Sequence, residues 1–140
     1  MQIYVYDEIK GGLEKYFQSL ENVDKNYIPL KVVGVAPSSP KYPYVQIKEV
    51  NNAPYQNFTS FRQKVADLSY KIDIYAKDKG QDYEKQDIAR NIMLLCDNYM
   101  NCIGLKQISF NEFEEGTNLS ITHIVLVYSA RYFENKQYFV

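Results

Sequence analysis

The sequence predicts an α+β domain, in which a mostly antiparallel four-stranded sheet packs against one long and one shorter helix and carries extended loop or hairpin arms. Two stretches repeat apolar residues at helical spacing, and four others have the pattern of strands. These stretches follow one another in the order helix, strand, strand, helix, strand, strand. A chain of 140 residues has the size of one compact domain, so we expect a single domain over residues 1–140.

Apolar stripes predict the two helices. Ile9, Leu13 and Phe17 recur at helical spacing within about residues 6–22, where the pair at 11–12, both glycine, favours a bend or a later start. The stronger stripe covers about residues 82–103 and consists of Ile88, Ile92, Leu95, Cys96, Tyr99 and Ile103. Gly104 follows at the position where a helix C-terminus favours a left-handed residue.

Four main strands are predicted over about residues 42–50, 66–76, 105–114 and 119–132. The segment 66–76 alternates most cleanly and places Asp67, Asp73 and Tyr75 on a face that we expect to be solvated. Residues 115–118 have the composition of a hairpin turn, and the run 124–128 is apolar on both faces, as expected of a central strand. A short edge strand near 32–35 and a final strand at the end complete the pattern.

A projecting loop is predicted from residue 51, because Asn51, Asn52 and Pro54 interrupt the first strand. The tip of this loop carries Tyr55, Phe58 and Phe61. Aromatic side chains are costly to leave in water, so these three either fold back onto the sheet or contact another subunit. The sequence leaves both outcomes open.

Composition argues against several classes of function. Sixteen Lys and Arg against seventeen Asp and Glu give no general attraction to nucleic acid. One histidine and two cysteines are too few for a typical zinc site, and no glycine-rich phosphate loop is present. Glu112 and Glu114 share a strand face, where a charged hairpin arm is favoured over a cation site, and His123 is interpreted as a structural or interface residue. We therefore expect no enzyme activity, metal or cofactor.

Four segments resemble the tail terminator proteins of long-tailed bacteriophages, also described as tail completion or minor capsid proteins. Residues 42–47 (YPYVQI) resemble the opening strand of that family, and residues 68–77 (LSYKIDIYAK) resemble its second strand. Residues 103–106 (IGLK) are similar to its entry to the third strand. Residues 128–132 (YSARY), with 135–139 behind them, resemble its closing strand, although Arg131 stands later than in the family pattern. The resemblance covers about residues 42–140.

This resemblance implies a structural virion protein that forms a hexameric ring. The ring caps the head-proximal end of the tail tube, ends tube polymerisation and joins the tail to the neck. The implied partners are other copies of the chain, the tail tube protein, a neck or head completion protein, and DNA that passes through the channel without specific binding. No membrane is implied; the location is the virion tail, with the host cytoplasm during assembly. Expected interface residues are Tyr55, Phe58, Phe61 and Tyr75, and expected channel-lining residues are Glu112, Glu114 and Glu115.

Two other classes of function remain open from the sequence. One is another head–tail connector or a tail-tube-related structural protein, and the second is a small binding module. A tube subunit would polymerise into long tubes, a terminator would stop at a ring, and a binding module would remain small and contain a deep pocket.

Overall fold

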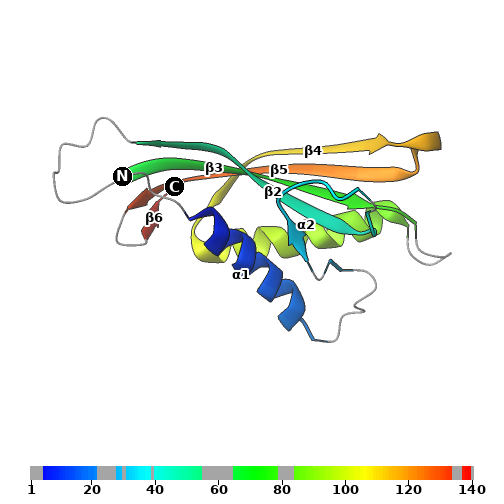
Figure 1. Cartoon of the computed structure of the whole chain (residues 1–140), viewed down its shortest axis with the longest axis horizontal. Coiled ribbons are helices and arrows are strands. Elements are labelled where there is room, and N and C mark those ends of the chain that lie inside the picture. The colour runs from blue at the N-terminus through cyan, green and yellow to red at the C-terminus, as the bar shows by residue number, and fades with distance from the viewer. Residues whose placement is uncertain are drawn as a thin grey trace.

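The computed structural model of the protein describes residues 5–21, 28–29, 31–38, 40–54, 65–78, 84–133 and 137–139, and only the backbone of 52–54, 65–66, 132–133 and 137–139. Two helices, α1 (Tyr6–Ser19) and α2 (Lys85–Ile103), lie on the same side of a long sheet (Figure 1). In the described part of the chain, the other face of the sheet carries no helix. This layered arrangement confirms the predicted α+β class.

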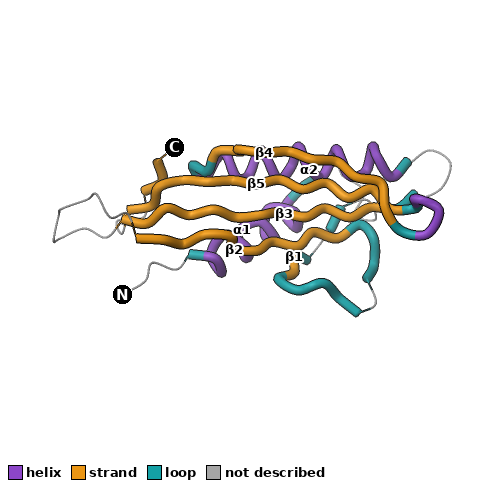
Figure 2. Tube along the Cα trace, turned by 90° about the horizontal axis from the view of Figure 1, so that it is seen from above, coloured by secondary structure: helices purple, strands orange, loops and turns teal. Residues whose placement is uncertain are grey.

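The sheet has the strand order β1-β2-β3-β5-β4 (Figure 2). The four long strands are β2 (Tyr44–Pro54), β3 (Val65–Ala76), β4 (Lys106–Glu115) and β5 (Ile121–Phe133), and all their pairings are antiparallel. Two short strands extend this sheet: β1 (Val32–Val33) pairs parallel with β2, and β6 (Gln137–Phe139) pairs with the end of β5. β4 therefore forms one edge, and β1 with β2 forms the opposite edge.

The core lies between the sheet and the two helices. Alternate residues of β3 and β5 point toward the helices, among them Ile72, Ile74 and Leu126, and none of these exposes any surface. Leu13 and Phe17 of α1 are equally buried, because the helical stripe turns them toward the sheet. Burying a side chain of this size contributes about 1.5–3 kcal/mol, so this layer stabilises the fold and orients both sheet edges.

The α2 helix ends as its sequence predicts. Gly104 adopts the left-handed conformation with φ 102°, and its N–H donates to the carbonyl oxygen of Met100 at 3.1 Å. A residue with a Cβ is strained at such a φ, whereas glycine is not. The chain then turns directly into β4, which places that strand beside α2.

The predicted start of the loop at residue 51 is wrong. Asn51, Asn52 and Pro54 do not begin a loop, because β2 continues through them and pairs with β3 as far as Ala66. The register shifts between Glu49 and Asn51, so Val50 forms a bulge that absorbs the irregularity. Proline is tolerated there because β2 is at an edge beyond its short pairing with β1.

The two glycines of α1 provide a matched test of helix packing. α1 runs without a break through both, and a Cβ at Gly11 would meet nothing within 4 Å, whereas one at Gly12 would overlap the Tyr99 hydroxyl and lie 3.0 Å from its Cζ. We expect Gly11→Ala to raise the free energy of unfolding by about 1 kcal/mol, because alanine favours the helix. Gly12→Ala should lower it by about 1–2 kcal/mol, because Tyr99 packs against Tyr16 and has to move. Urea unfolding of both variants tests this; equal effects would show that Tyr99 moves freely.

Candidate functional site

A row of stacked rings crosses the helix-free face of the sheet near one end. The Tyr44 and Tyr75 rings stack at 4.6 Å between centroids, and Tyr75 stacks on His123 at 4.1 Å. Tyr42 extends the row beyond Tyr44, and Phe113 extends it beyond His123. We call these five residues the aromatic row. It arises because β2, β3, β5 and β4 place one ring each at neighbouring register positions.

His123 lies between two carboxylates within this row. Its Nε2 is 2.7 Å from Oδ1 of Asp73, and its Nδ1 is 3.0 Å from Oε1 of Glu115. Carboxylates only accept hydrogen bonds, so both bonds form together when both ring nitrogens carry protons. Asp73 comes from β3 and Glu115 from the end of β4, so His123 joins three strands of the sheet.

The alternation of β3 predicts that Asp73 and Tyr75 lie on a solvated face, and this prediction is wrong. Asp73 is 3% exposed and Tyr75 is half-buried, because the aromatic row and His123 cover them. Burial, and then the nearby Asp73 carboxylate, raises the pKa of Tyr75 well above its ordinary value. Near this end, the helix-free face of the sheet (the open face) therefore contains partly buried side chains. Ring contacts and a histidine between two carboxylates stabilise them.

The three glutamates of β4 divide between the two faces of the sheet. Glu112 and Glu114 face α2, where Arg90 holds Glu112 through two bonds of 2.9 Å and Lys85 pairs with Glu114. Glu115 points to the open face and contacts His123. The shared face of Glu112 and Glu114 follows from the strand period, whereas the pairing of each with a cation of α2 follows from the packing of that helix against this edge.

The Arg90–Glu112 pair predicts a loss of stability in acid. The hydrogen bond from Arg90 lowers the pKa of Glu112 below its ordinary 4.5, against the opposing effect of partial desolvation. A lowered pKa in the folded state gives stability that is fully present above pH 4.5 and is lost as the pH falls through the folded value. We expect Arg90→Gln to be less stable than the parent at neutral pH and the difference to disappear in acid. Urea unfolding across the pH range measures this, with Lys15→Gln on α1 as the control; a deficit that persists in acid would contradict it.

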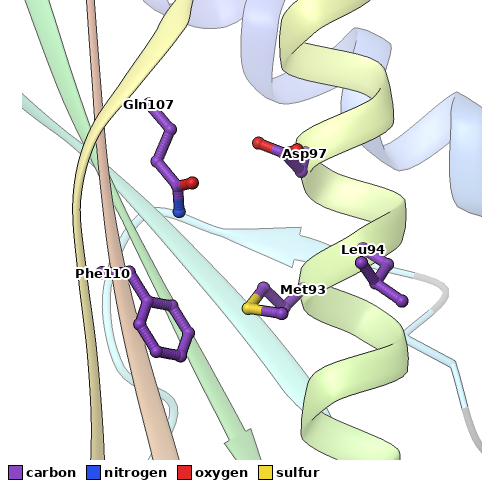
Figure 3. Close-up of a pocket in the computed structure, with 5 residues that line it drawn as sticks. All are labelled: Met93, Leu94, Asp97, Gln107 and Phe110. Atoms are coloured by element: carbon purple, nitrogen blue, oxygen red, sulfur yellow. The ribbon is translucent and has the colours of Figure 1, made fainter.

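A groove opens between α2 and the edge strand β4. It has a volume of about 300 Å³ and is lined by Met93, Leu94, Asp97, Gln107 and Phe110. Figure 3 shows the Phe110 and Gln107 side chains reaching from β4 toward Met93 and Asp97 on α2. Asp97 accepts a hydrogen bond of 2.8 Å from the Tyr128 hydroxyl, and burial, then that bond, raises the pKa of Tyr128. The groove is lined by three apolar and two polar side chains, and these do not form a cluster of catalytic groups.

The exposed large apolar side chains of the described residues gather at the two edges of the sheet. At the β4 edge these are Leu94, Ile108, Phe110, Phe113 and, in the hairpin turn, Leu119. At the opposite edge Val35 is 80% exposed just after β1, and Val50 is 59% exposed in the bulge of β2. Exposed apolar residues gathered at particular sites mark contact surfaces. Neither group is predicted above. The signal in the sequence is that Ile108, Phe110 and Phe113 place apolar residues on both faces of one strand.

Of the predicted contact residues, the structure describes Tyr75 and the three glutamates of β4. Tyr55, Phe58 and Phe61 lie outside the described residues. Tyr75 is part of the aromatic row. His123, interpreted as a structural or interface residue, lies in the same row between Asp73 and Glu115. The structure therefore brings together Tyr75, His123 and Glu115 on the open face, and separates Glu112 and Glu114 from them.

The described residues contain neither a candidate metal site nor a candidate membrane-spanning helix. No group of three or more His, Cys, Asp or Glu side chains there is arranged to hold a metal ion. Neither described helix combines the length and the apolar character needed to cross a membrane.

Comparisons with known proteins identify a shared fold. No protein-family model matches the sequence, and no curated protein matches it. Among solved structures, one matching chain belongs to a structure titled "Virion of native gene transfer agent (GTA) particle". That chain superposes with a TM-score of 0.60 at 12% sequence identity, over 87% of this chain and 92% of its own length. At this identity, the match establishes that the two chains have the same fold.

Proposed function

We propose that this protein is a structural component of a virion and, more specifically, a tail terminator. It assembles into a hexameric ring that caps the head-proximal end of the tail tube, stops tube growth and offers a surface to the neck. The observation that carries this proposal is the placement of exposed apolar residues at both sheet edges, which suits a chain that completes its packing by assembly. The fold shared with a chain of a virion particle supports the same class.

The role is one of shape and contact without catalysis. A ring made by cyclic assembly uses two different patches on each subunit, one meeting the other on its neighbour. Tyr75, with the aromatic row around it, is proposed as part of a contact surface, together with Tyr55, Phe58 and Phe61. Tyrosine suits such a surface because it combines a large rigid ring with a polar tip.

The acidic end of the β4–β5 hairpin is proposed to line the central channel, where negative charge keeps DNA from adhering. Glu115 is at the turn itself, while Glu112 and Glu114 are partly neutralised by Arg90 and Lys85. We expect a variant with glutamine at all three positions to assemble but to hinder DNA passage, because the channel wall loses negative charge. Phage infectivity measures the effect, with glutamine at the exposed Glu84 as the control. Infectivity equal to that of the parent would argue against a channel position.

Native mass spectrometry over a range of concentrations, alone and with the tail tube protein, tests the proposed function. A closed ring that stops at a fixed number of copies supports a terminator. Long tubes seen by electron microscopy would indicate a tube subunit instead. A chain that stays monomeric or dimeric even with tube protein present would overturn the proposal in favour of a binding module.

A further inference from the structure

We infer that the ring closes edge to edge: the outer edge of β4 in one copy pairs with β1 of the next copy, and the sheet continues around the ring. This inference rests on the proposed function and names the surface and the occupant that form its subunit contact. It commits to a second copy of this chain because the matching features lie on the opposite edge of the same molecule.

The first argument is the free edge itself. Within the described residues, no strand pairs with the outer side of β4. Its register is regular from Ser109 to Glu115, beyond the bulge at Ile108. An exposed edge of that length carries unpaired backbone donors and acceptors, which makes it a template for another strand. At the other end of the sheet, no described strand lies beyond the two-residue strand β1, whose Val32 N–H donates to Oε1 of Glu14 on α1 at 3.0 Å.

The second argument is strand direction. β2, β3, β5 and β4 alternate in direction along the sheet, so β4 runs opposite to β2. β1 is parallel to β2 and therefore also runs opposite to β4. A rotation about an axis roughly parallel to the strands places a second copy beside the first and keeps the sheet continuous. In this arrangement β1 of the second copy lies antiparallel to β4 of the first. This head-to-tail contact is of the heterologous kind that closes into a ring.

The third argument is the chemistry of the two edges. The β4 edge presents the apolar residues Ile108 and Phe113 together with Glu115, whereas Val35 is the most exposed large apolar residue of the opposite edge. That edge also carries the exposed lysines Lys31, Lys41 and Lys48. Apolar groups on both sides, with lysines opposite an edge where the Glu115 side chain is 44% exposed, give complementary surfaces.

Disulfide trapping tests this pairing in the full chain. Val33 of β1 lies opposite Gln46 and Asn111 of β4 lies opposite Val125, which places both on the helix-free face. We expect the variant Val33→Cys with Asn111→Cys, in a Cys102→Ser background that removes the exposed native thiol, to oxidise into a ladder of multimers on a non-reducing gel. Ser109→Cys in place of Asn111→Cys covers a register shifted by one pair. The control pairs Val33→Cys with Asn98→Cys, an exposed position on α2, and should give no ladder.

The outcomes separate the two proposals. A ladder up to the copy number of the ring supports edge pairing. Rings in native mass spectrometry without a ladder from either cysteine pair would overturn edge pairing and leave the terminator proposal intact. Dimers formed by Asn111→Cys alone would show a two-fold β4 contact and overturn the inference. A folded protein that forms neither rings nor crosslinks, with tube protein present, would overturn both.

Discussion

Replacing Asn111 by lysine is expected to give a folded monomer that no longer closes into a ring. Lysine on an edge strand opposes the addition of another strand, because its charge would lose water when that strand pairs. Asn111 is exposed and faces Val125 of β5 across the ladder, so the fold itself should lose at most about 0.5 kcal/mol. Native mass spectrometry detects the loss of rings, and thermal unfolding confirms that the monomer is intact.

Asn98→Lys is the matched control for this prediction. It makes the same chemical change at an exposed position of α2 and adds the same charge away from both edges. Rings should persist in this variant at the concentrations where the parent forms them. Rings of undiminished stability in Asn111→Lys would place the subunit contact away from β4.

Replacing His123 by phenylalanine should lower the free energy of unfolding by about 1–3 kcal/mol, the range for leaving a buried polar group without its hydrogen-bond partner. Phenylalanine keeps a ring against Tyr75 but removes both bonds to carboxylates. Among the described residues, the Asp73 side chain, 4% exposed, then retains Lys71 at 3.7 Å as its charged partner. Urea unfolding at neutral pH measures the difference.

A double variant tests whether this loss comes from the direct contact between His123 and Asp73. Asp73→Asn replaces the buried carboxylate with a neutral amide of the same shape, so adding it to His123→Phe should cost less than the two single losses combined. This non-additivity is the signature of a direct pair. A loss below about 1 kcal/mol for His123→Phe would instead show that water solvates Asp73 without help from the histidine.

Local patterns predict the elements and their order because each depends on neighbouring residues. The stripe around Ile88 and Ile92 becomes the buried side of α2, and the doubly apolar run of β5 lies between β3 and β4. Gly104 ends its helix as predicted. The end of β2 was not predictable in this way, because pairing with β3 and the bulge at Val50 overrides the local preference of asparagine for turns.

The site was predictable only in part, because it depends on contacts between distant segments. Asp73 and His123 are fifty positions apart, and only the register of β3 against β5 brings them within 2.7 Å. The alternation of β3 gave the correct face for Asp73 but not its burial, which Tyr44, Tyr75 and His123 produce together. The apolar edges depend on which strand ends the sheet, and strand order is not a property of any local pattern.

Asp97 belongs both to the groove beside β4 and to the interior. Its carboxylate holds the hydroxyl of Tyr128, a residue with no exposed surface in the middle of β5, while the same side chain lines the groove. A hydrogen-bond donor that binds in the groove would compete for the Asp97 carboxylate and weaken the hydrogen bond of the Tyr128 hydroxyl. Binding in the groove would therefore change the absorbance of Tyr128. Because the chain contains no tryptophan, this change can report association directly.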